Sequence, residues 1–241
     1  MIGQVIFRLF PLKTRGSVPD GRLVGIASAL PNNVYIGIPV MTPLFGRPAM
    51  IAIILSTWIF IMLVSGISIL LESKNNRQVS AMSSIVKIVK NPLLISILLG
   101  IIAGQYSSYI PSFIINSTNT LSSAVVPLAL FIVGFLLSEE IKSSNKKVGH
   151  QINTLVHIEI ILSLLFQPVI ALLFSHLFNL SHLWTQMTFI LFCLPSGITL
   201  VMIATKLGIG SGTITRISAV GTVYSIVTLV LATQLITLHM I

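Results

Sequence analysis

The sequence predicts an all-α membrane protein that crosses the bilayer several times. Hydrophobic residues make up 54% of its 241 positions and charged residues only 8%, and the mean hydropathy is +1.00. Soluble domains carry about one-quarter charged residues, so this chain cannot cover itself with a water-facing surface. Apolar runs near the roughly 20 residues that cross a bilayer recur without any alternating strand pattern. In lipid, the backbone polar groups must then be satisfied within helices.

Proline, glycine and charged residues divide the chain into seven apolar spans and a fragment. We read the fragment as the end of a helix, because it is too short for a signal peptide and lacks a small-residue cleavage site. The fragment lies near 1–10, and the spans lie near 22–45, 49–71, 91–106, 119–138, 151–178, 184–206 and 217–239.

The charge of +9 follows the connectors between these spans. Thirteen of the fourteen Lys and Arg residues fall on one side of the predicted membrane, and only Arg47 falls on the other. This asymmetry predicts that the basic side is cytoplasmic and that the C-terminus faces away from the cytoplasm. The basic residues form no continuous stripe, so we expect no nucleic-acid partner. Lys206 and Arg47 could attract an anion, but the charge rule and snorkelling explain them more simply.

Two spans are interrupted in their middle by proline with small or polar residues. Residues 29–39 read ALPNNVYIGIP, and residues 193–197 read CLPSG. Proline removes a helix hydrogen bond, and a break in lipid is tolerated only where neighbouring helices or a water-filled cavity satisfy the freed groups. Each break is therefore a pointer to a site, although an ordinary proline kink remains the alternative for either one alone.

The two breaks correspond in spacing, because Pro31 precedes Gly46 by fifteen residues and Pro195 precedes Gly208 by thirteen. One further span follows each. Matching broken helices in two halves are typical of an inverted-repeat transporter, with the substrate held at the midplane. By this spacing we expect a complete version of about ten spans in two halves of five, of which this chain would lack two helices and part of a third.

Several segments resemble the auxin efflux carrier family, which includes the PIN carriers and bacterial malate or malonate permeases. LPNNVYIGIP with a following LFG resembles the family's fourth helix, and NPLLISILLGIIAG (91–104) its sixth. VPLALFIVGFLLS (126–138) is similar to the seventh, and LPSGITLVMIATKLG (194–208) to the ninth. The similarity covers essentially the whole chain in the expected order.

The resemblance implies an elevator-type carrier whose two broken helices cross at Pro31 and Pro195 and hold an organic anion. Asn32 matches the family's asparagine at the crossing. Asn33 stands where Thr or Ser is usual, and Ser196 stands where the plant carriers have a longer polar amide, which argues against auxin as the substrate. The resemblance also implies a homodimer through scaffold helices.

The same resemblance divides the chain into moving and static parts. The moving transport domain would comprise the remainder of the first repeat and the end of the second, and the scaffold would lie between two cytoplasmic loops. In order, these parts are 1–71 (transport), 72–90 (loop), 91–138 (scaffold), 139–150 (loop) and 151–241 (transport).

An anionic substrate also follows from the physics of a broken helix. A restarted helix offers unpaired N–H groups and a partial positive charge, which suit a carboxylate. Side-chain amides can add donors, and glycine lets a ligand approach the backbone; helix capping is the alternative role of the asparagines. The predicted substrate-binding residues are Pro31, Asn32, Asn33, Gly37, Pro195, Ser196 and Gly197.

Glu159 is the acidic residue that lies well inside an apolar span. A carboxylate in the membrane is costly and usually serves a pathway, so Glu159 is the leading candidate for proton coupling. In the alternative interpretation it is hydrated near the cytoplasmic end or bonded to Ser163 one turn on. His157 lies two residues away and faces elsewhere on a helix.

Other functions find less support in the sequence. An intramembrane enzyme could use His157, Glu159 and Cys193, but none of the known catalytic motifs accompanies them. The single cysteine and the scattered histidines show no metal-ligand spacing, so we expect no metal and no cofactor. A shortened, inactive carrier is a third reading, because the expected missing helices would leave apolar surface uncovered.

Overall fold

The computed structural model describes residues 30–74, 86, 92–143, 150–198, 201 and 211–238, and this part of the chain forms helices without any strand. The fragment 1–10, the stretch 22–29 and residues 202–210, with Lys206 and Gly208, lie outside the described residues. The helices are α3 (Gly37–Phe45), α4 (Arg47–Lys74), α6 (Pro92–Gln105), the short 3-10 helix η1 (Ser107–Tyr109), α7 (Ser112–Ser143), α8 (His150–Leu177), α9 (His182–Phe192) and α11 (Ser211–Thr237).

These helices follow the predicted apolar spans, which confirms the all-α fold class. Helix α7 begins seven residues before the predicted span 119–138. The added stretch, 112–118, contains three hydroxyl side chains, and that of Thr118 donates to the carbonyl of Ile114 at 2.9 Å; a little further on, Ser123 donates to the carbonyl of Thr120 at 2.7 Å. Such local bonds let Ser and Thr extend a membrane helix beyond its apolar core.

Two of the described helical stretches are long and apolar enough to cross a membrane, Val156–Leu177 in α8 and Gly212–Thr237 in α11. The described parts of α4 and α6 contain shorter apolar stretches, Arg47–Leu63 and Ile95–Gln105. Length and composition therefore support two of the seven predicted spans directly.

The chain divides into two compact units. One comprises Met50–Val125, and the other comprises the described residues up to Ala49 together with those from Val126 onwards. This division reflects contacts within each unit and does not test the predicted division into moving and static parts, which stays a prediction. The predicted breaks at Pro31 and Pro195 both belong to the second of these units, which is described below.

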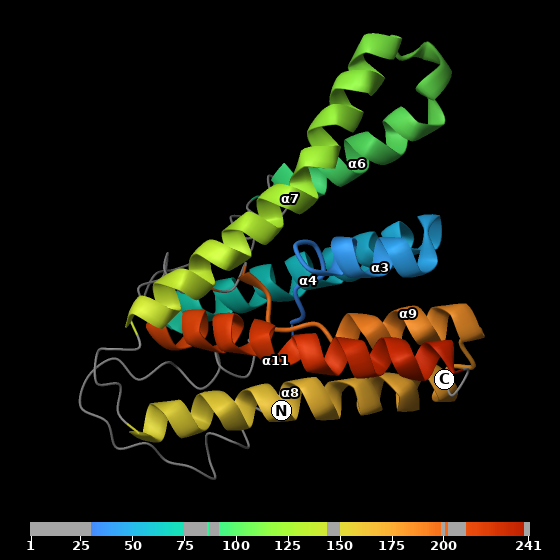
Figure 1. Ribbon diagram of the computed structural model, residues 1–241. Helices are drawn as coiled ribbons and strands as arrows, with labels where there is room; N and C mark the ends of the chain where they lie inside the picture. Colours follow the sequence, from blue (N-terminus) through green and yellow to red (C-terminus); the bar gives the residue numbers. More distant parts are fainter. Residues whose placement is uncertain are drawn as a thin grey trace. The chain divides into compact units, whose positions relative to one another are not determined.

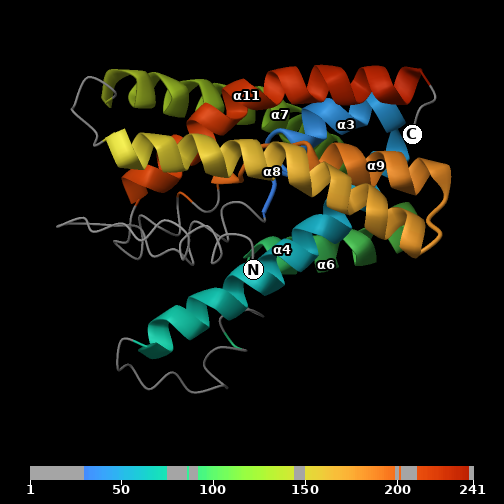
Figure 2. The same cartoon turned by 90° about the horizontal axis from the view of Figure 1, so that it is seen from below.

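In this unit, α8 packs against α9 and α11, and α3 packs against α9. Figures 1 and 2 show that α9 runs opposite to α8 and α11, and that α3 lies beside α9. The core is formed where one apolar face of each helix meets its neighbours. Its most deeply buried side chains are Met41, Val156, Ile160, Met187, Ile190, Ile214 and Ile217.

Proline alone does not interrupt the helices of this protein. Pro43, Pro127 and Pro168 lie inside α3, α7 and α8, which continue through them. By contrast, α9 ends at Phe192, and the chain is not helical from Cys193 to Gly197. The residues from Leu30 to Ile36 are likewise not helical, and α3 begins after them. The difference lies in the neighbours of the proline, because Asn, Ser and Gly favour turns over helix.

Gly221 of α11 lies where α8 and the second break come together. A Cβ atom at this position would stand 3.7 Å from Cγ1 of Ile160 and 3.7 Å from Cβ of Pro195, which is ordinary van der Waals contact. The site therefore has room for a methyl group and no more. Small residues at helix contacts let membrane helices approach closely.

We expect Gly221→Leu to destabilise the protein by about 1–3 kcal/mol, because the larger side chain must push α8 or the Pro195 segment away. Thermal unfolding in detergent measures the loss. Gly221→Ala should melt no lower than the wild type. Gly212→Leu is the matched control, since Gly212 lies on the same helix with nothing within 4 Å of its Cβ position. Equal melting temperatures for Gly221→Leu and Gly212→Leu would contradict the packing.

Candidate functional site

The two predicted breaks meet as a short antiparallel pairing of extended backbone. Pro31 and Ser196 form the bridge. The N–H of Asn32 donates to the carbonyl of Pro195 at 2.7 Å, and the N–H of Gly197 donates to the carbonyl of Leu30 at 3.0 Å. Each non-helical segment thus satisfies backbone polar groups of the other.

The hydroxyl of Ser218 adds a third bond to this crossing from α11. It donates to the carbonyl of Ser196 at 3.1 Å, across 22 residues of sequence, and both side chains are buried. Sequence reasoning missed Ser218 and Gly221. The spacing of Ser218, Gly221 and Ser225 could have indicated them, because it places three small residues along one face of a helix.

The first turn of α3 differs from the sequence-based expectation of free N–H donors. The N–H of Gly37 donates to the carbonyl of Asn32 at 3.0 Å, Ile38 donates to Val34 at 3.4 Å, and Val40 donates to Ile36 at 3.2 Å. Pro39 has no N–H to offer. The expectation is therefore wrong for the start of α3, because a preceding turn supplies the acceptors.

The side chains of Asn32 and Asn33 hold the polar atoms that remain without a partner at the crossing. Their exposed fractions are 3% and 5%. The Nδ2 of Asn32 and the Oδ1 of Asn33 are buried without a hydrogen bond. Ile36 is the N-cap residue of α3, and no side chain caps it. The asparagines therefore do not cap the start of α3, and a helix end before Leu30 lies outside the described residues.

The other predicted binding residues lie in the same place and serve the crossing through their backbone. Pro195 and Ser196 are buried, and their carbonyls accept the bonds from Asn32 and Ser218. Gly37 is buried at the first position of α3. The structure thus brings all seven predicted residues together at one point, and their contact with a substrate stays a prediction.

Glu159 lies on the face of α8 that packs against α9 and α11. Its exposed fraction is 1%, and both carboxyl oxygens are buried without a hydrogen bond. Ser163 is not its partner, because the Ser163 hydroxyl donates to the carbonyl of Ile160 at 3.0 Å. The alternative of a carboxylate bonded to Ser163 is wrong for this structure.

Comparison with known proteins identifies the family of this chain. The family model described as membrane transport protein matches residues 1–233. The chain belongs to this family of membrane transporters. The resemblance to the auxin efflux carriers is confirmed by the match. A membrane location follows, and the family supports a transport role rather than an enzymatic one.

The chain is also similar to a protein described as an uncharacterized transporter of Methanocaldococcus jannaschii. The two are 32% identical over 143 residues, which cover 57% of this chain and 43% of that protein. The matched part is therefore less than half the length of that relative.

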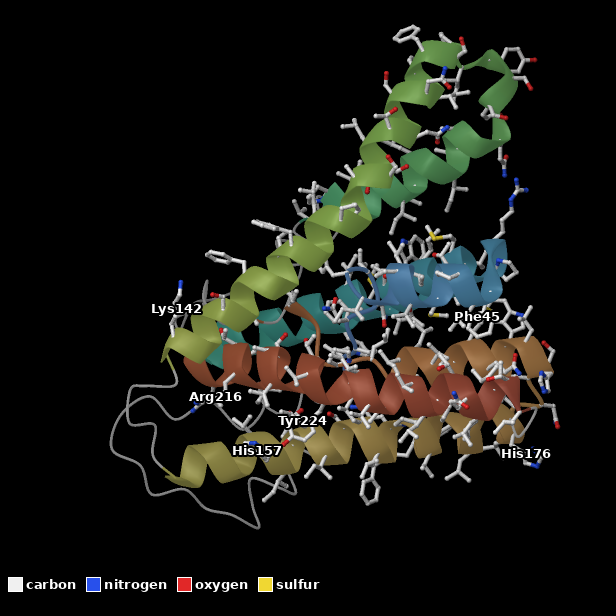
Figure 3. All side chains as sticks on the ribbon, in the orientation of Figure 1. Phe45, Lys142, His157, His176, Arg216 and Tyr224 are labelled. Atoms are coloured by element: carbon white, nitrogen blue, oxygen red, sulfur yellow. The ribbon has the colours of Figure 1, made fainter. Side chains whose placement is uncertain are left out.

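Two residues of the enzyme alternative, His157 and Cys193, lie in packed parts of the unit. The ring of His157 makes an edge contact with Tyr224 of α11, with ring centroids 5.9 Å apart (Figure 3). Cys193 is a free, buried thiol next to the second break. The described residues contain no group of three or more His, Cys, Asp or Glu side chains that could hold a metal ion.

A cavity of about 260 Å³ lies between α8 and α9, apart from the predicted binding residues. Its walls are mostly aromatic and aliphatic, so it suits an apolar side chain or lipid tail better than an anion. It is lined by Gln167, Ile170, Ala171, Phe174, Ser175, Phe178, Leu180, Thr188 and Phe192.

Cys193 is the single cysteine of the chain and a natural reporter of the crossing. We expect Ser218→Ala to weaken the crossing by about 1 kcal/mol, because it removes the bond to the Ser196 carbonyl, and so to speed maleimide labelling of Cys193 about fivefold. Ser225→Ala is the matched control, since that buried hydroxyl bonds only the carbonyl of Thr222 on its own helix, at 2.8 Å. Equal labelling rates in both variants would contradict a role of Ser218 in closing the crossing.

Proposed function

We propose that this protein is a secondary transporter for a small organic anion, a mono- or dicarboxylate of the malate or malonate type, bound beside the crossing of residues 30–37 and 194–198. The observation that carries the proposal is the buried, unpartnered amide Nδ2 of Asn32. A buried donor without an acceptor costs about 1–3 kcal/mol, and a carboxylate oxygen would remove that cost.

The neighbouring asparagine refines the proposed substrate. The buried Oδ1 of Asn33 lacks a donor, so the two adjacent side chains offer one donor and one acceptor. A hydroxy acid or a half-protonated dicarboxylate presents the complementary pair. A carboxylate also suits the dipole of α3, whose N-terminal end lies at the crossing even though its first N–H groups are bonded.

The proposed mechanism is alternating access of the elevator type, in which the crossing moves with the helices that enclose it. The crossing is held by backbone bonds between its two segments and by Ser218 of α11. Such a unit can move as a whole while keeping the site intact, which is the general property of inverted-repeat carriers.

The proposed orientation places the basic connectors in the cytoplasm and the C-terminus on the opposite side. Figure 3 shows Arg216 near one end of its unit, with Phe45 and His176 near the other. Arg216 would therefore lie toward the cytoplasm and the α8–α9 turn toward the outside, as the distribution of charges predicts.

We expect uptake of radiolabelled malate or malonate into vesicles that contain the full chain, and a loss of at least about tenfold in Asn32→Asp. The substitution keeps the side-chain volume but replaces the donor by a negative charge that repels the anion. Asn32→Ala should be impaired less, since it removes the donor without adding charge.

Asn116→Asp is the control, because Asn116 is an exposed asparagine on α7. Wild-type uptake that Asn32→Asp leaves intact would contradict binding at the crossing. Chemical conversion of the solute without its accumulation would indicate an enzyme instead.

The proposed orientation gives a separate prediction. Alkaline phosphatase fused after Ile241 should be active, and green fluorescent protein fused at the same position should be dark, because each reporter works on one side of the membrane only. Fusions at the predicted cytoplasmic loop after Lys147 should give the opposite result. The same result at both positions would contradict the orientation.

A further inference from the structure

Glu159 is the buried acidic group that binding of the anion does not by itself explain. Its carboxyl group shares the inner face of α8 with Val156, Ile160, Ser163 and Leu164, all of them buried. This face packs against α9 and α11. A carboxylate enclosed in this way, with no donor for either oxygen, is far more costly than a neutral carboxylic acid. The packing seen here therefore accepts the protonated form.

The titratable groups on the packed helices leave this conclusion unchanged. No hydrogen bond joins the Glu159 carboxyl to any of them in the described part of the chain, since both of its oxygens are without a partner. On α8 itself, the His157 ring is turned to Tyr224. The groups on the packed helices are His182 at the start of α9, Cys193 just after its end, and Arg216 and Tyr224 on α11.

The position of Glu159 ties its packing to the crossing. The next residue, Ile160, and Pro195 of the second break flank the same glycine, Gly221, each with an atom 3.7 Å from its Cβ position. The carbonyl of Pro195 accepts a bond from the backbone N–H of Asn32. The side-chain amide of Asn32 is the proposed hydrogen-bond donor to the anion. A separation of α8 from α11 that admits water to Glu159 would therefore also disturb the contacts behind the anion site.

We propose that Glu159 binds the proton that accompanies the anion, so that the protein is a proton–anion symporter. The inference rests on the proposed function. The carboxylate takes one proton from water on the side where the anion enters and returns it to water on the other side, and no other bond forms or breaks. When the anion is bound, the helices close over Glu159 only if its carboxyl group is neutral.

Electrostatics fixes the direction of coupling. An ionised Glu159 and a bound carboxylate would place two negative charges within one helix unit of low dielectric constant, where like charges repel strongly. Proton and anion therefore bind together and travel the same way. Antiport would require the two negative charges to be buried together in one half of the cycle.

The test uses the full chain in vesicles, with the membrane potential clamped by potassium and valinomycin. A gradient of one pH unit, acidic outside, should drive about tenfold accumulation of labelled malonate, the limit for one proton per anion. Glu159→Gln should keep exchange of labelled for unlabelled malonate but lose the accumulation. His157→Gln, two residues away, is the matched control and should keep both.

The wild-type chain supplies a second readout that needs no substitution. Protonated carboxyl groups in apolar surroundings add to dicyclohexylcarbodiimide, so peptide mass spectrometry should find the adduct on Glu159, with faster modification at acidic pH. This measurement decides the matter if Glu159→Gln fails to fold.

The outcomes separate the two proposals. Absence of malonate, malate and related carboxylate uptake by the wild type would overturn the proposed function and this inference with it. Uptake that ignores the pH gradient, that follows a sodium gradient instead, or that stays pH-driven in Glu159→Gln would overturn the inference alone. Failure of the carbodiimide to modify Glu159 at acidic pH would also overturn it.

Discussion

The backbone pairing between residues 30–32 and 195–197 is the constraint on which the described site depends. Both segments are non-helical, and bare N–H and C=O groups in a membrane find no water to satisfy them. Antiparallel pairing solves the problem for both segments at once, through the bonds of Asn32 to Pro195 and of Gly197 to Leu30. Each non-helical segment thus supplies hydrogen-bond partners to the other.

The crossing divides its polar groups into two sets. Backbone groups are bonded to each other, to the turn before α3 or to Ser218, which makes the frame rigid. The side-chain amides of Asn32 and Asn33 are enclosed in that frame with atoms that have no partner. Native proteins rarely leave buried polar atoms unsatisfied without a reason, and a bound solute is such a reason. Rigid backbone around unsatisfied side chains is the arrangement that a preorganised binding site requires.

The packing of α11 connects this frame to the rest of its unit. Gly221 lies in contact distance of both α8 and the second break, and the hydroxyl of Ser218 bonds the crossing. Glu159 lies on the α8 face of this contact. The carboxyl group proposed to bind the proton and the site proposed to bind the anion are thus parts of one packed unit.

The sequence by itself predicted the all-α fold and the helices, because these follow from long apolar runs, and it predicted the two breaks from proline beside Asn, Ser and Gly. The transporter family and the crossing at Pro31 and Pro195 came from the resemblance of its motifs to a known family. It did not determine which polar atoms stay free. That was decided in the tertiary structure, where the turn before α3 occupies the expected backbone donors, and Ser163 bonds its own helix and leaves Glu159 alone. Hydrogen-bond partners are chosen by three-dimensional proximity, and Ser218 reaches Ser196 from 22 residues away. A pattern of residue types carries no record of that choice.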